Sequence, residues 1–251
     1  MAKAILVIGD MGTGKSTSLR NLPPTETIII TPNSKDLPWE GAMKYFNKRN
    51  GNLISCLKIK KAVMTDPNEA NGVLENLALA NKNPVIKYVV LEDLTHFMND
   101  RMLDDKFVAS QDWSKWNRFG ADMFAITTKH IQSMRDDLTV IIIGHTEAKD
   151  NGVMGLQTAG KLLDNTVKLP SYFTYVFHSR VFSQNNVLTY KFQTHNDGKY
   201  LAKTPMGMFK DDFVDNDMKD IITTIDDYRN GKAITATAAP VATPGVPVKL
   251  G

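Results

Sequence analysis

The chain has 251 residues, of which 42% are hydrophobic and 23% charged, a composition typical of a soluble globular protein with one substantial core. The net charge of +3 is too small to indicate nucleic-acid binding by itself, and the single cysteine, Cys56, excludes an internal disulfide.

Cellular location is predicted from the same features. No apolar run approaches the ~20 residues that a membrane helix needs. Strand residues begin at Ala4, which leaves no signal peptide, and one cysteine fits a reducing compartment. We therefore expect a cytoplasmic protein with no membrane partner.

The first predicted element is a buried strand that leads into a glycine-rich loop. The apolar run Ala4–Ile8 is followed at once by G-x-x-x-x-G-K-S and then by residues suited to a helix. This order indicates a phosphate-binding loop rather than an ordinary glycine turn. Lys15 would neutralise the β- and γ-phosphates, and the Ser16 hydroxyl would join a Mg²⁺ shell. The residues expected to bind the nucleotide are Gly9, Asp10, Met11, Gly12, Thr13, Gly14, Lys15, Ser16 and Thr17.

Beyond Pro23-Pro24, a second buried strand is predicted at Thr27–Thr31, and a helix from Asp66-Pro67 to about Lys82. Weaker elements lie between them.

Residues 1–61 hold ten Lys and Arg against four Asp and Glu. This basic region either follows a phosphate backbone or is a solvated face. Its clustered members are Lys44, Lys48, Arg49, Lys58, Lys60 and Lys61.

The third predicted strand, Val85–Asp93, ends in two adjacent carboxylates, Glu92 and Asp93. An apolar central strand that delivers a carboxylate to the sheet edge is typical of a Walker B strand, which orients the Mg²⁺ shell. Strand alternation would send the two side chains to opposite faces. The sequence therefore leaves open which carboxylate orients the Mg²⁺ shell and which polarises the attacking water.

A long amphipathic helix is predicted from about Gln111 to Met134. Its apolar stripe has helical spacing, which favours core packing over a base-stacking surface. His130 lies on that stripe and is therefore expected to be a packed residue. The stripe consists of Trp116, Phe119, Met123, Ile126, His130 and Met134.

The fourth buried strand, Leu138–Gly144, closes with His145-Thr146-Glu147. Ligands occupy the carboxyl edge of open α/β sheets, so His145 or Thr146 is expected to sense the γ-phosphate. A simple strand-end cap is the alternative. Residues 150–158 are glycine-rich and expected to be mobile, and a short helix is predicted at 160–164.

The last third of the chain changes to β-type residues. A hairpin is predicted from Tyr172–Phe182 and Val187–Thr194, followed by a turn at Asn196-Asp197-Gly198. The final helix is predicted at Met218–Arg229. We expect one domain over residues 1–231 and a disordered Ala/Thr/Pro-rich tail over 232–251.

Together these motifs resemble the RecA-like branch of P-loop ATPases, and more narrowly the bacteriophage ATP-binding proteins related to single-strand annealing and recombination ATPases. The resemblance covers about residues 3–230. It implies an α/β fold with a mostly parallel central sheet flanked by helices and a C-terminal β-hairpin extension. It also implies ATP and Mg²⁺ as cofactors, single-stranded DNA as a partner, a homo-oligomer and contact with a single-strand-binding protein. The motifs that carry it are Gly9–Thr17, Ser34–Pro38, Val89–Asp93, Arg135–Val140, Gly144-His145, Thr158–Lys161 and Asn196–Phe209.

The chain also departs from the RecA-like pattern. The second strand ends Thr31-Pro32-Asn33 without the usual catalytic glutamate. Water activation would therefore fall to Glu92, Asp93 or Glu147, and hydrolysis would be slow or stimulated by DNA. Where relatives carry an arginine that reaches the neighbouring subunit's nucleotide, this chain offers Lys203, with Lys161 as a second candidate. The resemblance thus assigns catalysis to Lys15, Glu92, Asp93, His145 and Lys203, and Mg²⁺ to Ser16 and Asp93.

Two other functions fit the sequence. The missing glutamate would suit a nucleotide-gated binding or assembly factor with little turnover. A small-molecule kinase also begins with this loop, but no arginine-rich lid is evident.

Overall fold

The structure is a computed structural model that describes residues 1–32, 35–159, 163 and 167–232. Ser34, the predicted helix at 160–164 apart from Leu163, and the predicted tail beyond Lys232 lie outside these residues. Lys161 lies outside them too. None of the helices in the described residues is long and apolar enough to cross a membrane.

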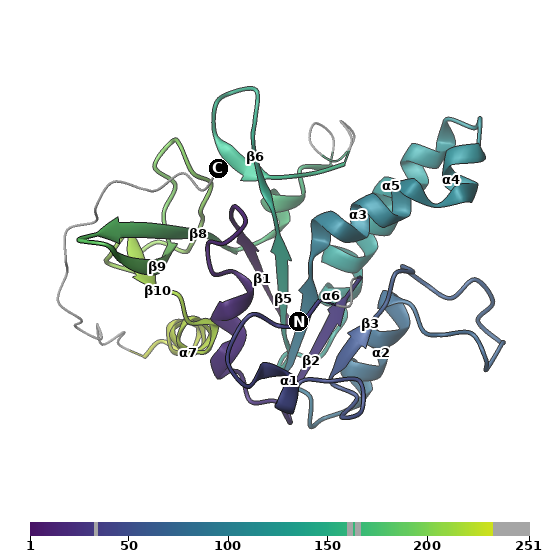
Figure 1. Ribbon diagram of the computed structural model, residues 1–251, viewed down its shortest axis with the longest axis horizontal. Coiled ribbons are helices and arrows are strands. Elements are labelled where there is room, and N and C mark those ends of the chain that lie inside the picture. Colours follow the sequence, from purple (N-terminus) through teal and green to yellow (C-terminus); the bar gives the residue numbers. More distant parts are fainter. Residues whose placement is uncertain (33–34, 160–162, 164–166, 233–251) are drawn as a thin grey trace.

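The described residues form one large sheet, in the strand order β10-β9-β8-β1-β5-β4-β2-β3 (Figure 1). The strands from β8 through β3 are parallel, and β9 and β10 add antiparallel pairings at one edge. This confirms the predicted α/β fold with a mostly parallel sheet and a C-terminal hairpin extension. The strands are β1 (Lys3–Ile8), β2 (Thr27–Thr31), β3 (Leu53–Ser55), β4 (Tyr88–Glu92), β5 (Thr139–Gly144), β8 (Tyr175–Gln184), β9 (Val187–Gln193) and β10 (Phe213–Asp215).

Helices cover both faces of the sheet. Along β1, Leu6 and Ile8 pack into one apolar cluster with α2, α3 and α5, whereas Ile5 and Val7 pack into a second with η1, α1 and α7. This alternation is why the central strands are apolar throughout. The helical elements are η1 (Ser16–Asn21, 3₁₀), α1 (Ala42–Tyr45), α2 (Val73–Lys82), α3 (Leu94–Leu103), α4 (Asp105–Ala109), α5 (Ser114–Phe124), η2 (Ala125–Lys129, π), α6 (His130–Gln132), η4 (Leu169–Tyr172, 3₁₀) and α7 (Met218–Arg229).

The strand register brings the predicted motifs to one edge of the sheet. Ile8 aligns with Gly144 across β1 and β5, and Glu92 aligns with Ile143 across β4 and β5. The segments that follow these three strands therefore emerge side by side. They are the glycine-rich loop, the Glu92-Asp93 pair and His145.

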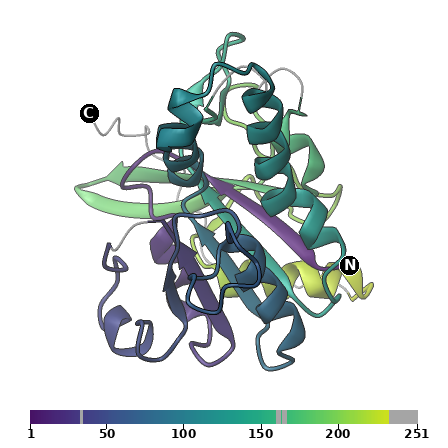
Figure 2. The same ribbon diagram turned by 90° about the vertical axis from the view of Figure 1, so that its right-hand side faces the viewer.

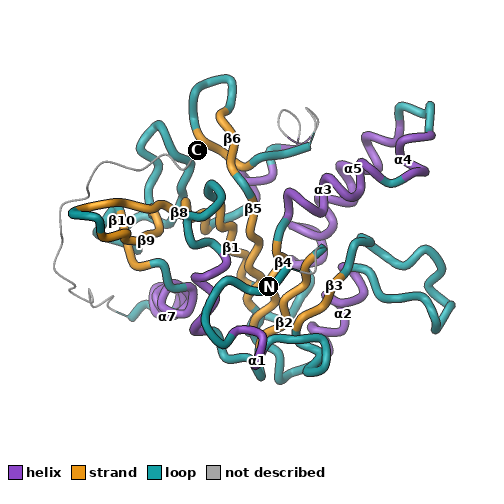
Figure 3. Tube along the Cα trace, in the orientation of Figure 1, coloured by secondary structure: helices purple, strands orange, loops and turns teal. Residues whose placement is uncertain are grey.

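Three predicted helices differ in the structure. The helix after the glycine-rich loop is only the six-residue 3₁₀ helix η1, because Pro23-Pro24 follows at once. Helix α2 begins at Val73, not near Asp66, since the Glu75 carboxylate accepts the Gly72 N–H at 2.8 Å and defines the start there. Figure 3 shows the chain between β3 and α2 as a long loop.

The third difference is a π-turn within the predicted helix at 111–134. The π-helix η2 inserts one residue into the helical repeat, which rotates the buried face by one position. Ile131 is therefore buried and His130 is exposed, so the prediction that His130 packs in the core is wrong. Phe119, Met123 and Ile126 are buried as predicted.

The segment predicted as a mobile loop at 150–158 contains a strand. Met154–Leu156 (β7) pairs with Thr146–Ala148 (β6) in a separate two-stranded sheet. The main chain of Met154 also bonds to Lys199 and Leu201. This hairpin and the longer β8–β9 hairpin both extend past the sheet edge, and Figure 2 shows the β8–β9 hairpin in green projecting sideways.

Candidate nucleotide-binding site

A cavity of about 930 Å³ opens at the carboxyl edge of the central strands. The glycine-rich loop forms its floor, and the ends of β4 and β5 form one wall. Strand β9, the end of β10 and the start of α7 form another wall. Side chains on these walls include Lys15, Ser16, Thr31, Glu92, Asp93, His96, His145, Tyr190, Asn216 and Asp217.

Glycines allow the loop to lie against neighbouring backbone. A Cβ atom on Gly9 would stand 2.8 Å from the Ser179 carbonyl oxygen, and Gly14 adopts a φ of +89° that side chains disfavour. Ser179 Oγ donates to the Thr13 carbonyl at 2.6 Å, and Asn216 Nδ2 donates to Ser179 Oγ at 3.1 Å. The C-terminal part of the chain thus supports the loop from outside.

Lys15, the last residue of the glycine-rich loop, folds its side chain back against the loop. Its Nζ donates to the carbonyl oxygens of Gly9 at 2.8 Å and Asp10 at 2.7 Å. Burial lowers the pKa of this ammonium, while the nearby carboxylates of Asp93 and Glu92 oppose that shift. A buried cation with only carbonyl partners is well suited to exchange them for phosphate oxygens.

Glu92 is the carboxylate that contacts the loop. Ser16 Oγ donates to Glu92 Oε1 at 2.5 Å, although the two residues are 76 positions apart. Burial raises the pKa of Glu92 to about 7, and the Ser16 hydrogen bond only partly offsets this effect. Its other oxygen, Oε2, is buried and has no hydrogen-bond partner among the described residues. An unpartnered buried carboxylate oxygen beside a hydroxyl is a fitting pair of ligands for Mg²⁺.

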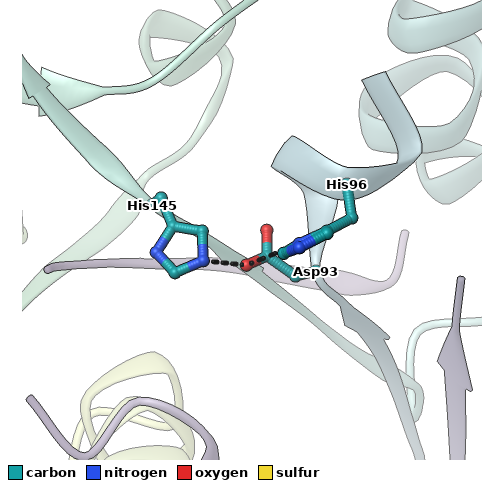
Figure 4. A group of neighbouring side chains, drawn as sticks. All are labelled: Asp93, His96 and His145. Carbon is teal, nitrogen blue, oxygen red and sulfur yellow. Dashed lines mark ion pairs between the residues drawn. The ribbon is translucent and has the colours of Figure 1, made fainter. Parts of the chain in front are cut away.

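Asp93 lies outside the strand, as the N-cap of α3, so its side chain enters the same cavity as Glu92 and not the opposite face. Its Oδ1 accepts the Thr95 N–H at 2.8 Å, and its Oδ2 lies 2.8 Å from His145 Nε2 (Figure 4). Burial favours the protonated acid, but the hydrogen bond and charge of His145, the Thr95 N–H and the charge of His96 together hold the pKa of Asp93 below its usual range.

His145 and Thr146, the two predicted phosphate sensors, have different surroundings. His145 lines the cavity, and its main-chain N–H donates to Thr95 Oγ1 at 3.1 Å. Thr146 Oγ1 instead donates to Asp10 Oδ1 at 2.5 Å, which ties β6 to the glycine-rich loop. Glu147, the third candidate for water activation, does not line the cavity. Its Oε1 lies 2.6 Å from Lys149 Nζ.

Three features together are typical of a nucleotide-binding P-loop. A buried lysine ends a glycine-rich loop that follows a strand, a serine hydroxyl donates to a carboxylate at the end of another strand, and a cavity opens beside both. A family model described as an AAA domain, AAA_24, matches residues 1–205. The chain belongs to the AAA_24 family. It therefore contains an ATPase domain of the P-loop class.

Comparison with solved structures gives distant likenesses. One is a KaiC-like protein from the hyperthermophilic archaeon Pyrococcus horikoshii OT3, with 13% identity, a TM-score of 0.44, and coverage of 76% of this chain and 78% of that chain. Another is the flagellar accessory protein FlaH from Methanocaldococcus jannaschii, with 11% identity, a TM-score of 0.43, and coverage of 80% and 82%. Among curated proteins no match was found. These likenesses identify neither a substrate nor a partner for the AAA_24 chain.

Other predicted functional residues lie away from the cavity of this AAA_24 domain. Lys203 is exposed, forms an isolated backbone bridge with Val176, and places its Nζ 3.5 Å from the Ser171 carbonyl oxygen. The basic cluster divides: Lys44, Lys48 and Arg49 are exposed around α1, whereas Lys58 pairs with Glu69 at 2.8 Å.

Sequence reasoning missed several residues of the site. His96 was detectable, because it follows Asp93 by three residues and so faces the same side of a helix start. Ser179, Tyr190 and Asn216 carry no local signal. They reach the loop only because β8 lies beside β1 in the sheet.

Proposed function

We propose that the protein is a Mg²⁺-dependent ATPase in which Ser16 and Glu92 hold the metal. The observation that carries this proposal is the 2.5 Å contact between Ser16 Oγ and Glu92 Oε1, beside Lys15 in one cavity. Mg²⁺ held by these two residues would supply positive charge that stabilises the phosphates during transfer. Lys15 would bind the same phosphates once its Nζ leaves the carbonyl oxygens of Gly9 and Asp10.

This proposal exchanges the sequence-based roles of the two carboxylates. Asp93 was expected to share Mg²⁺ with Ser16, but its Oδ2 faces His145 and its Oδ1 faces the Thr95 N–H. We therefore assign Asp93 and His145 to the part of the cavity where the attacking water is oriented. The ionised carboxylate fixes the orientation of the imidazole, which is the usual work of such a pair.

Two variants test the ATPase proposal together. Lys15→Ala should remove nucleotide binding, because it deletes the cation that meets the phosphates. Glu92→Gln should retain nucleotide binding without Mg²⁺ but lose the Mg²⁺-dependent gain, with turnover lower by on the order of 10²-fold or more. Calorimetric titration with and without Mg²⁺ and a phosphate-release assay measure these effects.

The exposed Lys210→Ala variant is the matched lysine control and should behave as wild type. Thermal melts establish that each variant is folded. Wild-type nucleotide affinity in folded Lys15→Ala would refute the P-loop assignment. Tight MgATP binding with no turnover in the wild-type chain would instead favour the nucleotide-gated assembly factor. The support for that alternative is that the second strand ends at Thr31 without the catalytic glutamate.

We further propose that single-stranded DNA is the macromolecular partner, in the recombination or replication setting that the phage resemblance suggests. The support is the exposed cations Lys44, Lys48 and Arg49, which lie within six residues of one another around α1. Cations that follow a phosphate backbone release counterions on binding, so affinity should fall with salt.

Fluorescence anisotropy with an oligothymidylate at several salt concentrations tests this DNA proposal. Each lost phosphate contact should reduce the log–log salt slope by about 0.7. Replacing Lys44, Lys48 and Arg49 together with alanine should therefore flatten the slope by about 2. Lys58→Ala is the control, because its ammonium already pairs with Glu69. A slope that the triple variant leaves unchanged, or no binding with MgATP present, would contradict the proposal.

A further inference from the structure

Three potential metal ligands converge at one end of the cavity. Asp93, His96 and His145 each offer one ligand atom, and these atoms all lie within 4.8 Å of one another (Figure 4). Asp93 Oδ2 lies 2.8 Å from His145 Nε2 and 3.5 Å from His96 Nδ1. The carboxylate oxygen thus stands between two imidazoles that come from different elements.

The backbone around α3 fixes this arrangement. Asp93 caps α3, and His96 follows one turn later on the same side of the helix. Thr95 fixes the other two residues, since its N–H binds Asp93 Oδ1 and its Oγ1 accepts the His145 main-chain N–H. Ligands held by such outer contacts are typical of metal centres in proteins.

Hydrogen bonding alone accounts poorly for His96. Its Nδ1 is buried and has no hydrogen-bond partner among the described residues, and 3.5 Å to Asp93 Oδ2 is too long for a good one. Ligand atoms around a tetrahedral ion, each at about 2.0–2.1 Å from it, lie about 3.3 Å apart. The two distances from Asp93 Oδ2 bracket this value, and all three ligand atoms lie within 4.8 Å of one another. An ion there would replace the Asp93–His145 hydrogen bond and give both imidazoles a partner.

We propose that Asp93, His96 and His145 bind a first-row transition-metal dication of the Zn²⁺ type. Two imidazoles and one carboxylate suit Zn²⁺ and its neighbours, whereas Mg²⁺ and Ca²⁺ prefer oxygen ligands. Three protein ligands leave a fourth position open, as in catalytic zinc sites, and all three of these residues line the cavity.

This site is separate from the Ser16–Glu92 pair assigned to Mg²⁺. Binding of the transition metal does not depend on the proposed ATPase function, although its placement beside the nucleotide phosphates does. The two can therefore fail independently. Loss of nucleotide binding in Lys15→Ala should leave the Asp93–His96–His145 site intact.

Co²⁺ titration of the purified full chain, stripped of metal and free of nucleotide and Mg²⁺, tests the proposal. We expect one Co²⁺ per chain, with the visible absorption of a four-coordinate ion, displaced by Zn²⁺ and not by Mg²⁺. His96→Ala and His145→Ala should each weaken Co²⁺ binding by at least about tenfold. The exposed His130→Ala is the matched control and should bind Co²⁺ as wild type does. Cys56, the single cysteine, is buried in an apolar cluster and is not among the three ligands, so thiolate absorption should be absent from the spectrum.

Proton NMR of the wild-type chain provides a test that needs no variant. The chain has five histidines, and one equivalent of Co²⁺ should perturb the ring resonances of two of them first. Lys15→Ala should give the same Co²⁺ spectrum. The proposal is overturned if Co²⁺ binding is not saturable at one equivalent, or if it survives in folded His96→Ala and His145→Ala.

Discussion

At the scale of single residues, the chemistry of the site depends on how far each charged side chain is removed from solvent and which groups it contacts there. Asp93 and Lys15 are buried and Glu92 is partly buried at one sheet edge, and their environments differ. Asp93 has an imidazole and a backbone N–H as partners, whereas Glu92 has one hydroxyl. The two adjacent carboxylates are therefore suited to different roles. Asp93 is suited to accept hydrogen bonds as an ionised group, and Glu92 is suited to bind a cation.

His178 gives a test of burial at the same scale. It is 1% exposed on β8, its Nδ1 lies 3.3 Å from the Leu201 carbonyl oxygen, and burial lowers its pKa to about 4. The unfolded chain has the ordinary histidine pKa of about 6.5, so between these values the unfolded state binds more protons. The free energy of unfolding should therefore fall as pH falls from about 6.5 to 4, by about 3 kcal/mol from this residue.

Urea unfolding of wild type and His178→Gln at pH 7 and pH 4 measures this contribution. The variant should lose less stability on acidification than wild type, whatever its stability at pH 7. His130→Gln, at an exposed position, should keep the wild-type difference. Equal acid sensitivity in His178→Gln and wild type would mean that His178 is not buried as a neutral ring.

At the scale of elements, the β8–β9 hairpin builds one wall of the cavity. Strand β8 pairs with β1 only over Tyr175–His178, and its remainder extends past the glycine-rich loop together with β9. The turn at Asn185-Asn186 places both residues at positive φ, which asparagine tolerates and which matches the twist of a two-residue hairpin. The hairpin thereby carries Tyr190 to within 3.0 Å of where a Gly14 Cβ would stand.

Tyr190→Ala should weaken nucleotide affinity by about tenfold or more, because an aromatic ring on a cavity wall can stack on a base for about 1–3 kcal/mol. Calorimetric titration with ATP and with inorganic triphosphate separates base from phosphate contacts. Only ATP binding should change. Val187→Ala, exposed near the tip of the same hairpin, is the control. Equal losses for both ligands would show that Tyr190 supports the loop rather than the base.

At the scale of the whole molecule, the cavity draws on nearly the full length of the described chain. The family match ends at residue 205, yet Asp215, Asn216, Asp217 and Asp220 line the cavity beyond it. Arg20 ties the two parts together, with Nη1 donating to the Asn216 carbonyl at 2.7 Å and Nη2 lying 3.3 Å from Asp217 Oδ2. The C-terminal helix is therefore part of the site.

Lys203 bears on assembly. It lies outside the cavity of its own chain, so any catalytic role would have to be exerted on a neighbouring subunit. Under this hypothesis Lys203→Ala should keep nucleotide affinity but lower turnover, since a cation supplied in trans stabilises transition-state charge. Mixing Lys203→Ala with Lys15→Ala should then restore part of the activity in a phosphate-release assay. Turnover in Lys203→Ala that equals wild type at every protein concentration would contradict a role in trans.

Local patterns alone were enough to identify much of this molecule. Residue periodicity and turn chemistry, which act over a few neighbours, predicted the apolar strand before Gly9, the strand ending at Gly144 and the helix Met218–Arg229. They also predicted a strand that leads to Glu92, although it begins at Tyr88 and ends one residue earlier than expected. The P-loop assignment rests on eight consecutive residues. The basic cluster, the tail and the role of Lys203 remain predictions.

Two short-range features escaped the periodicity analysis: a one-residue π-turn moved His130 out of the core, and the Glu75 carboxylate set the start of α2. Other features depended on tertiary structure. Above all, the partners of the two adjacent acids were not readable from the sequence: Ser16 meets Glu92, and Asp93 meets His145 and His96. These pairings join residues on separate elements. They depend on strand order and on where Asp93 leaves its strand, and no local pattern encodes either.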